Sequence, residues 1–350
     1  ERGELYGRAG ILGRQAVGGD TGPSRGAAGA TTGHRADTTG RHTLPGVPRY
    51  EITRQRSPDD VAAVGELIRS AESAVGQQLI TEHRFHDAAF GGGRDFAGLV
   101  AWSDAHDRPL AYSQVIRGER RWELELVYDH DQARVVDGLG AAAEVLAAAI
   151  AVVRAEGGGH VHLWITRPTE AHDRLATGVG LAPGRELWQL RRPLPVDEEW
   201  QLTTRPFVVG QDEDAWLEVN NRAFDWHPEQ GGWTIDDLRS RESEPWFDPA
   251  GFLLHEIDGR LAGFCWTKVH ADHDPPLGEI YVIAVDPDIH GRGLGRALAL
   301  AGLAHLHDKG LRVGMLYVDA DNAPATGLYL DMGFALDHLD RAYVGDVDPA

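Results

Sequence analysis

The feature that most constrains the fold is an internal repetition, because the same order of predicted elements occurs twice along the chain. In the second copy, two apolar runs joined at Asp258-Gly259 predict a hairpin, followed by a strand (279–285), a helix (294–309), another strand and a short helix (323–332). The first copy has ELELVYD where the second has EIYVIAV. A mixed α/β chain can show such an order by chance, but several landmarks in register favour a duplicated α/β domain.

Composition sets the domain boundaries. Positions 1–47 carry almost no large apolar side chain, so this segment cannot offset its ordering entropy and is predicted to be a disordered tail. The first domain is then predicted over 48–195 and the second over 205–350. A Pro- and acid-rich stretch at 196–204 is the predicted linker.

Charge and cysteine content exclude several classes of protein. The chain has 34 Lys and Arg against 54 Asp and Glu, a net charge of −20, which repels nucleic acid and anionic membranes. Cys265 is the single cysteine, so no intrachain disulfide can form. No apolar run approaches about 18 residues, and the first residues lack the apolar core of a secretory signal. We therefore expect a cytoplasmic monomer with a small-molecule substrate and with no nucleic-acid or membrane partner.

The stretch HGRGLGRA, at 290–297, is the most informative motif. It follows a predicted strand and opens a predicted helix, where free backbone N–H groups can bind an anion and glycines let the backbone approach it. The spacing is not that of a dinucleotide fingerprint, and the G-K-[ST] ending of a Walker loop is missing. Taken alone, the stretch is equally compatible with a glycine-rich turn that binds nothing.

This loop and the residues around it resemble motifs of the GCN5-related N-acetyltransferase (GNAT) family. V-D-P precedes the loop, which is similar to the family's motif A, [QR]-x-x-G-x-[GA], although His290 stands where Gln or Arg is usual. Downstream, N-A-P-A-T-G-L-Y-L-D-M-G-F resembles the family's closing motif. The resemblance implies two tandem α/β (α+β) GNAT domains, each a mixed, mostly antiparallel sheet flanked by helices, and acetyl-CoA as co-substrate.

The resemblance also assigns roles to residues. Those expected to hold acetyl-CoA are Ile283, Ala284, Val285, His290, Gly291, Arg292, Gly293, Leu294, Gly295, Arg296, Asn322, Ala323, Pro324, Ala325, Thr326 and Gly327. Acetyl transfer needs a neutral amine and a proton for the leaving thiolate. Glu279 is the expected base and Tyr329 the expected acid. A solvated glutamate at a strand end and a packing tyrosine are the alternative interpretations.

The first copy differs at the positions that matter. It keeps Gly138-Leu139-Gly140, but Val135 replaces His290 and Asp137 replaces Arg292, and a carboxylate disfavours phosphate. Ala176 stands at the register of Tyr329. We expect the first domain to be catalytically inactive and the chemistry to belong to the second.

Stretches such as Gly263–His270, together with the tandem repeat, resemble an actinobacterial branch of the family that acetylates the cysteinyl amine of cysteinyl-glucosaminyl-inositol. By this resemblance the substrate contacts would be Glu82, Glu229, Lys268, Glu279 and Tyr317. Two alternatives stay open: an acetyltransferase for another small amine, and a non-catalytic module that senses acyl-CoA.

Two remaining features receive plain interpretations. His270 and His273 are placed in a Pro/Asp loop and match no zinc template, so no metal is expected. Cys265 lies among apolar neighbours in a predicted strand and is interpreted as a small buried residue.

Overall fold

The computed structural model describes residues 50–54, 57–76, 79, 96–103, 108–118, 121–131, 135–227, 230–271, 273–289 and 293–350. The predicted tail (1–47), Glu82, Glu229 and the motif residues 290–292 lie outside these ranges. The chain divides into two compact units, which are described separately. Of the described residues, the C-terminal unit contains Leu163–Ala176 and Leu181–Val344, and the N-terminal unit contains those from 50 to 162 with Thr177–Gly180 and Gly345–Ala350.

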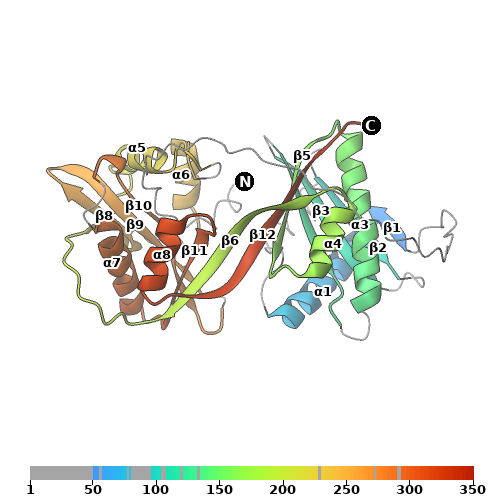
Figure 1. Cartoon of the computed structure of the whole chain (residues 1–350), viewed down its shortest axis with the longest axis horizontal. Coiled ribbons are helices and arrows are strands. Elements are labelled where there is room, and N and C mark those ends of the chain that lie inside the picture. Colours follow the sequence, from blue (N-terminus) through green and yellow to red (C-terminus); the bar gives the residue numbers. More distant parts are fainter. Residues whose placement is uncertain are drawn as a thin grey trace, which may run out of the picture. The chain divides into compact units, whose positions relative to one another are not determined.

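The N-terminal unit contains an antiparallel sheet in the order β1-β2-β3-β4 (Figure 1). Its strands are β1 (Glu51–Arg54), β2 (Phe96–Trp102), β3 (Pro109–Arg117) and β4 (Trp122–Tyr128), and β5 (Gly159–Thr166) begins in this unit. Two helices, α1 (Pro58–Val75) and α3 (Val135–Ala155), pack against the sheet. A capping box between Ser57 and Asp60 starts α1.

Helix α3 is unusually apolar. Within the described residues it holds one stretch, Gly138–Ala155, that is long and apolar enough to cross a membrane by length and composition alone. Ala141, Ala142, Leu146 and Ala149 are buried where the helix packs against β2, β3 and β4. Packing on a sheet accounts for this composition.

The C-terminal unit contains a mixed sheet in the order β7-β8-β9-β10-β11-β6-β12. The strands are β7 (Arg205–Pro206), β8 (Phe252–Ile257), β9 (Arg260–His270), β10 (Leu277–Val285), β11 (Val313–Asp319), β6 (Ala182–Pro193) and β12 (Ala335–Val347). The helices are α4 (Glu170–Gly178), α5 (Glu213–Ala223), α6 (Ile235–Glu242), α7 (Leu294–Asp308) and α8 (Ala323–Asp331), with 3-10 turns at Pro249–Gly251 and Pro287–Ile289. Each neighbouring pair in this order is antiparallel except β10–β11, which confirms the predicted mixed, mostly antiparallel sheet.

Several local predictions are confirmed. The β8–β9 hairpin turns at Asp258 and Gly259, whose φ angles of 52° and 74° suit a two-residue turn with left-handed backbone. Helix α7 begins at Leu294, and α8 covers the predicted 323–332 helix to within one residue. These elements depend on signals carried by neighbouring residues.

Strand β6 has a partner that its place in the repeat does not indicate. By sequence it closes the first copy, yet it lies between β11 and β12. It pairs with β11 from Val313↔Pro193 to Asp319↔Leu187, and with β12 from Ala335↔Arg191 onward. The division into compact units follows this packing, whereas the predicted boundary at 195 follows the repeat.

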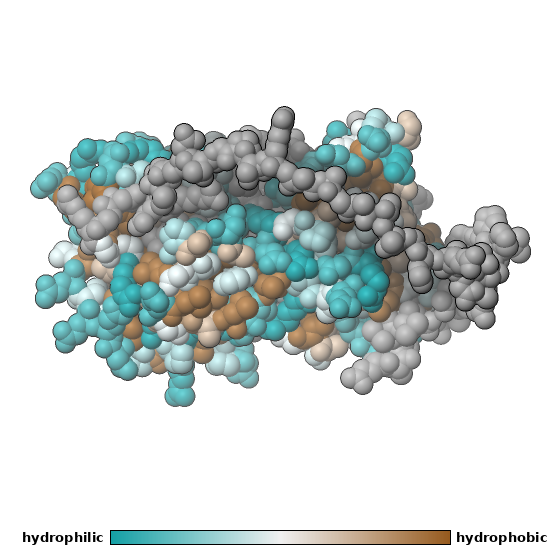
Figure 2. All heavy atoms as spheres, viewed as in Figure 1, coloured by the Kyte–Doolittle hydropathy of each residue, from teal (hydrophilic) through white to brown (hydrophobic). Residues whose placement is uncertain are grey.

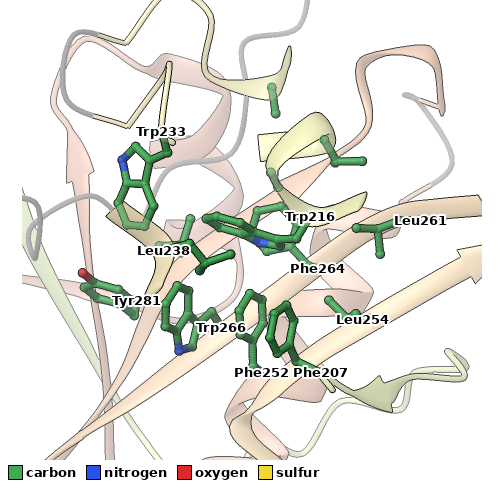
Figure 3. Close-up of a cluster of buried hydrophobic side chains, with 14 of the residues drawn as sticks. Phe207, Trp216, Trp233, Leu238, Phe252, Leu254, Leu261, Phe264, Trp266 and Tyr281 are labelled. Atoms are coloured by element: carbon green, nitrogen blue, oxygen red, sulfur yellow. The ribbon is translucent and has the colours of Figure 1, made fainter. Parts of the chain in front are cut away.

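Two apolar clusters cover the two faces of the C-terminal sheet. One lies under α5 and α6 and is aromatic, with Trp266 stacked on Phe252 at 4.3 Å between ring centroids (Figure 3). The other lies under α7 and α8 and includes Leu298, Ile283 and Tyr329. The alternation of side chains along β9 and β10 separates the two clusters.

Glycine allows α7 to approach the sheet closely. A Cβ at Gly302 would collide with the Sγ of Cys265, and one at Gly263 would lie 2.9 Å from the Leu298 side chain. Cys265 is fully buried and burial raises the pKa of its thiol, so it packs as a small neutral residue in this interface. The surface seen in Figure 2 intersperses hydrophobic residues among hydrophilic ones.

Candidate active site

The candidate site begins where β10 and β11 separate. The two parallel strands pair only over Gly278↔Gly314 to Ile280↔Leu316, although β10 continues to Val285 and β11 to Asp319. The register of β10 with β9 shifts between Ile280 and Val282, which marks a bulge. Beyond the bulge, Ile283, Ala284 and Val285 pair with β9 on one edge, and β11 does not pair with the other edge. This is the splayed edge of β10, and it can offer backbone groups to a ligand.

Helix α7 starts without a side-chain cap. Gly293 is its N-cap in the left-handed conformation, at φ 71°, and provides no capping hydrogen bond. The first intrahelical bond runs from the Ala297 N–H to the Gly293 carbonyl, so the N–H groups of Leu294, Gly295 and Arg296 have no partner within the helix. Such a terminus suits an anion such as a pyrophosphate.

Helix α8 starts differently from α7. Asn322 is its N-cap, and the Asn322 side chain accepts a hydrogen bond from the Ala325 N–H at 3.3 Å. The Thr326 hydroxyl donates to the Asn322 carbonyl at 3.1 Å. A Cβ added to Gly327 would meet open space. The first turn of α8 is therefore held by its own side chains.

Arg296 points toward a protein carboxylate. Its Nε and Nη2 donate to the two oxygens of Glu198, at 2.6 and 2.8 Å, from the predicted linker. The geometry is bidentate and occupies the guanidinium. The side chain of Arg296 is thus occupied by Glu198, and its backbone N–H is the group that can bind an anion.

Glu279 is the third residue of β10 and is fully buried. Its Oε2 lies 2.7 Å from the Nε2 of His270, and its Oε1 has no hydrogen-bond partner among the described residues. This burial excludes the interpretation as a solvated glutamate at a strand end. A buried carboxylate with one free oxygen can accept a proton from a bound amine.

Tyr329 is fully buried in α8, against Phe334 at 5.7 Å between ring centroids. Its hydroxyl has no hydrogen-bond partner in the described part of the chain. Burial raises the pKa of the Tyr329 phenol far above its ordinary range, with a further contribution from Cys265. The group is therefore protonated at neutral pH, the form that a general acid requires.

The two expected catalytic side chains lie on opposite faces of β10. Tyr329 belongs to the same cluster as Ile280, and alternation directs Glu279 to the other face. The splayed edge of β10 lies between the two faces.

Lys268 and Tyr317 share a face with Glu279. Lys268 is directly opposite Glu279 in the β9–β10 ladder, and its Nζ lies 4.4 Å from the centroid of the Trp246 ring. Tyr317 stands two residues after Met315, the β11 partner of Glu279. The Tyr317 hydroxyl accepts a hydrogen bond at 2.7 Å from Gln189. The structure thus brings together three of the predicted substrate contacts, while Glu82 and Glu229 lie outside the described residues.

Two residues of this site were not recognised from the sequence. The prediction that His270 lies in a Pro/Asp loop is wrong: it is the last residue of β9, because the β9–β10 ladder extends to Leu277↔His270. Gln189 comes from β6 and reaches Tyr317, a contact that depends on a strand pairing distant in sequence. A glutamine alternating with apolar residues in LWQL was the one signal available for it.

A buried polar network lies at the end of β11. The Arg185 guanidinium, from β6, bonds both oxygens of Asp319, and its Nη2 lies 2.8 Å from the Nε2 of His227. The Nδ1 of His227 accepts a hydrogen bond from the Gln230 N–H at 2.9 Å. The network thus joins β6 and β11 to the segment between α5 and α6.

Comparison with known proteins identifies the family. Residues 216–334, which include the splayed strands, α7 and α8, match the Acetyltransferase (GNAT) family. A mycothiol acetyltransferase of Acidimicrobium ferrooxidans is 42% identical over 285 residues, 78% of this chain and 90% of that protein. The chain belongs to the GNAT acetyltransferase family. It is an N-acetyltransferase.

Other GNAT proteins extend the comparison. A mycothiol acetyltransferase of Thermobispora bispora is 41% identical, over 84% of this chain and 98% of that protein. A GCN5-related N-acetyltransferase structure from Sphaerobacter thermophilus has a TM-score of 0.62 at 23% identity, covering 88% of this chain and 98% of its own. A tandem GNAT protein of clavulanic acid biosynthesis has a TM-score of 0.60 at 14% identity, covering 86% and 99%. Both structures show the fold, and the second is a tandem GNAT protein.

Proposed function

We propose that this acetyltransferase transfers the acetyl group of acetyl-CoA to the cysteinyl amine of cysteinyl-glucosaminyl-inositol, which gives mycothiol and CoA. The relatives named mycothiol acetyltransferase support this substrate. The observation that carries the chemistry is the buried Glu279, whose Oε1 has no hydrogen-bond partner among the described residues. Glu279 belongs to β10, which splays from β11 further along the strand.

Acetyl-CoA fits the described part of the second repeat. The uncapped start of α7 offers N–H groups to its pyrophosphate, and the splayed edge of β10 offers backbone to its pantetheine arm. When bound, it supplies the acetyl group as an activated thioester. Ile283, Ala284, Val285 and Gly293 to Arg296 are the described residues that would hold it, with the turn at Asn322–Gly327.

The catalytic roles follow from protonation states. An α-amino group has a pKa of about 7.7–8.0, so at neutral pH a base must remove one proton from the bound ammonium. Glu279 accepts that proton on Oε1. The Tyr329 phenol is protonated at neutral pH, and burial raises its pKa further, so it holds a proton for the leaving sulfur.

Substrate contacts come from the face that carries Glu279. Lys268 and Tyr317 can orient the hydroxyls of the sugar and inositol, as Glu82 and Glu229 would by resemblance to the family. In the first repeat, a buried Ala176 stands at the register of Tyr329 and cannot supply a proton. We infer that the second repeat alone catalyses transfer.

The test is acetyl transfer measured by mass spectrometry with the full chain. Purified cysteinyl-glucosaminyl-inositol is compared with a panel of simple amines, since the thiol of the substrate would obscure a thiol assay. We expect selective acetylation of the cysteinyl amine, lowered about 10²- to 10⁴-fold in kcat/KM by Glu279→Gln. Glu256→Gln, an exposed β8 residue bound to Arg205, is the matched control and should retain activity.

Each other outcome rejects a defined part of the proposal. Turnover of other amines alone would reject the thiol sugar and leave an acetyltransferase for a different small amine. Bound acetyl-CoA with no turnover of any amine would indicate an acyl-CoA-sensing module.

A further inference from the structure

We propose that His270 is a positioning residue for the base: its Nε2–H donates to Oε2 of Glu279, which holds the carboxylate ionised with Oε1 free for the amine proton. This rests on the proposed function of Glu279. Neither the expected catalytic residues nor the expected substrate contacts include His270.

The geometry assigns His270 this role. The ring nitrogen and the carboxylate oxygen are 2.7 Å apart, the distance of a charge-assisted hydrogen bond. The Glu279 side chain has no exposed surface, whereas 19% of the His270 side chain is exposed. His270 therefore connects a fully buried carboxylate to the protein surface.

A buried carboxylate needs such a partner. Removal from water disfavours the charged form, and an isolated buried carboxylate takes up a proton instead. A protonated Glu279 cannot act as a base. Among the described residues, His270 forms the hydrogen bond to this carboxylate, at Oε2, and Oε1 has no partner.

Lys268 does not replace His270 in this role. It is the direct cross-strand partner of Glu279, but its Nζ lies over the Trp246 ring at 4.4 Å and 5.6 Å from the centroid of Tyr281. The aromatic faces hold the ammonium. His270 reaches Glu279 along the diagonal of the same ladder instead.

The other titratable and charged groups around Glu279 come from several elements. Lys268 lies on β9, Tyr281 on β10 and Tyr317 on β11, and His273 packs edge-on against His270 at 5.6 Å between ring centroids. Arg241 of α6 and Glu244 act on Tyr281, whose pKa burial raises, so that its phenol stays neutral. Replacing His270 also removes its ring contact with His273, so the ionisation of Glu279 is followed by infrared spectroscopy as well as by the pH profile.

The proton transfer balances at stated atoms. One N–H bond of the substrate ammonium breaks and its electron pair stays on nitrogen, while an O–H bond forms at Oε1 of Glu279. The His270 hydrogen bond to Oε2 persists throughout. After product leaves, the Glu279 proton passes to water and the carboxylate is restored.

The experiment compares His270→Ala and His270→Gln in the full chain. Gln places an N–H donor near the position of Nε2, whereas Ala leaves none. We expect His270→Ala to move the acid limb of kcat/KM upward until most of the enzyme carries a protonated base at pH 7, which lowers kcat/KM about tenfold at that pH. The loss should diminish toward pH 9, with the KM for acetyl-CoA unchanged.

Two controls give the result its meaning. His270→Gln should stay within about threefold of wild type, because the hydrogen bond is retained. His255→Ala removes a β8 histidine that bonds the Thr203 carbonyl, and it should leave the profile unchanged. A profile for His270→Ala that matches wild type would overturn the inference.

Infrared spectroscopy separates this inference from the proposed function. The proteins are produced with ¹³C-labelled glutamate, and the spectrum of Glu279→Gln is subtracted from each spectrum. The remaining carboxyl band belongs to Glu279 and reports whether it is ionised, without any turnover. We expect a carboxylate band at pH 7 in wild type and a protonated carboxyl band in His270→Ala. Equal ionisation in both proteins would overturn the role of His270, whereas full activity in Glu279→Gln would reject Glu279 as base and leave the infrared comparison valid.

Discussion

Several buried side-chain oxygens of the second repeat have no hydrogen-bond partner in the described part of the chain, and two of them belong to the expected catalytic residues. Glu279 leaves Oε1 and Tyr329 leaves its hydroxyl without a hydrogen bond. An unsatisfied buried polar group costs stability, and proteins keep such groups mainly where function needs them. The sequence motif placed Tyr329 in α8, but the isolation of its hydroxyl depends on residues from β9, β10 and α8 together.

The replacement Tyr329→Phe should separate stability from activity. Removing an unpartnered buried hydroxyl is expected to raise the free energy of unfolding by about 1 kcal/mol, while kcat for acetyl transfer falls. Tyr343→Phe is the matched control, because that buried hydroxyl donates to Asp173 at 2.7 Å and its loss should destabilise. Urea unfolding measures the free energy of unfolding of both variants, and acetyl transfer assays measure kcat. A Tyr329→Phe protein less stable than wild type would contradict the prediction.

At the scale of elements, strand ends and helix starts build the site. The β10–β11 splay and the end of β11 belong to one sheet, and the uncapped start of α7 belongs to a helix that packs on that sheet. Asp319 ends β11 and is bound by Arg185 of β6 and by His227. These contacts fix the segment that follows α5.

Asp319→Asn should destabilise the protein in a pH-dependent way. Burial alone would raise the pKa of Asp319, but His227 and Arg185 outweigh it and hold the pKa below its usual range. A depressed pKa in the folded state contributes stability above the unfolded pKa of about 3.9, and this is lost as pH falls through the folded value. We expect a loss of about 2 kcal/mol at pH 7 that shrinks below about pH 4. Chemical unfolding from pH 3 to 8 measures it, and a pH-independent difference would contradict this account.

At the scale of the whole chain, the repeat does not coincide with the packing. Strand β6 lies between β11 and β12, so the sheet that carries the site depends on residues before the predicted linker. Gln189 and Arg185 both reach the site from this strand. The second copy of the repeat by itself lacks the central partner of its last two strands.

A fragment of residues 205–350 should therefore fail to fold. Without β6, both β11 and β12 present unpaired edges, which favour aggregation. A fragment of residues 163–350 retains β6 and is expected to be folded and monomeric. Size-exclusion chromatography and circular dichroism compare the two, and a folded, monomeric 205–350 fragment would contradict the prediction.

Much of the fold could be predicted from sequence because its signals are local. The Asp258-Gly259 hairpin, the start of α7 at Leu294 and the α8 boundaries depend on turn residues, glycine and apolar periodicity within a few positions. The acetyltransferase family followed from two motifs, each contained in one short stretch. Neighbouring residues determine these features, so reading them does not require the rest of the chain.

Tertiary structure decided what depends on distant segments. The placement of β6, the pairing of Arg296 with Glu198 and the bond from His270 to Glu279 join residues that no local pattern links. A strand can pair with any compatible edge, and the burial of a polar group depends on everything packed around it. The sequence by itself therefore determined the elements and the reaction class, while long-range pairing and burial decided which side chains meet at the site.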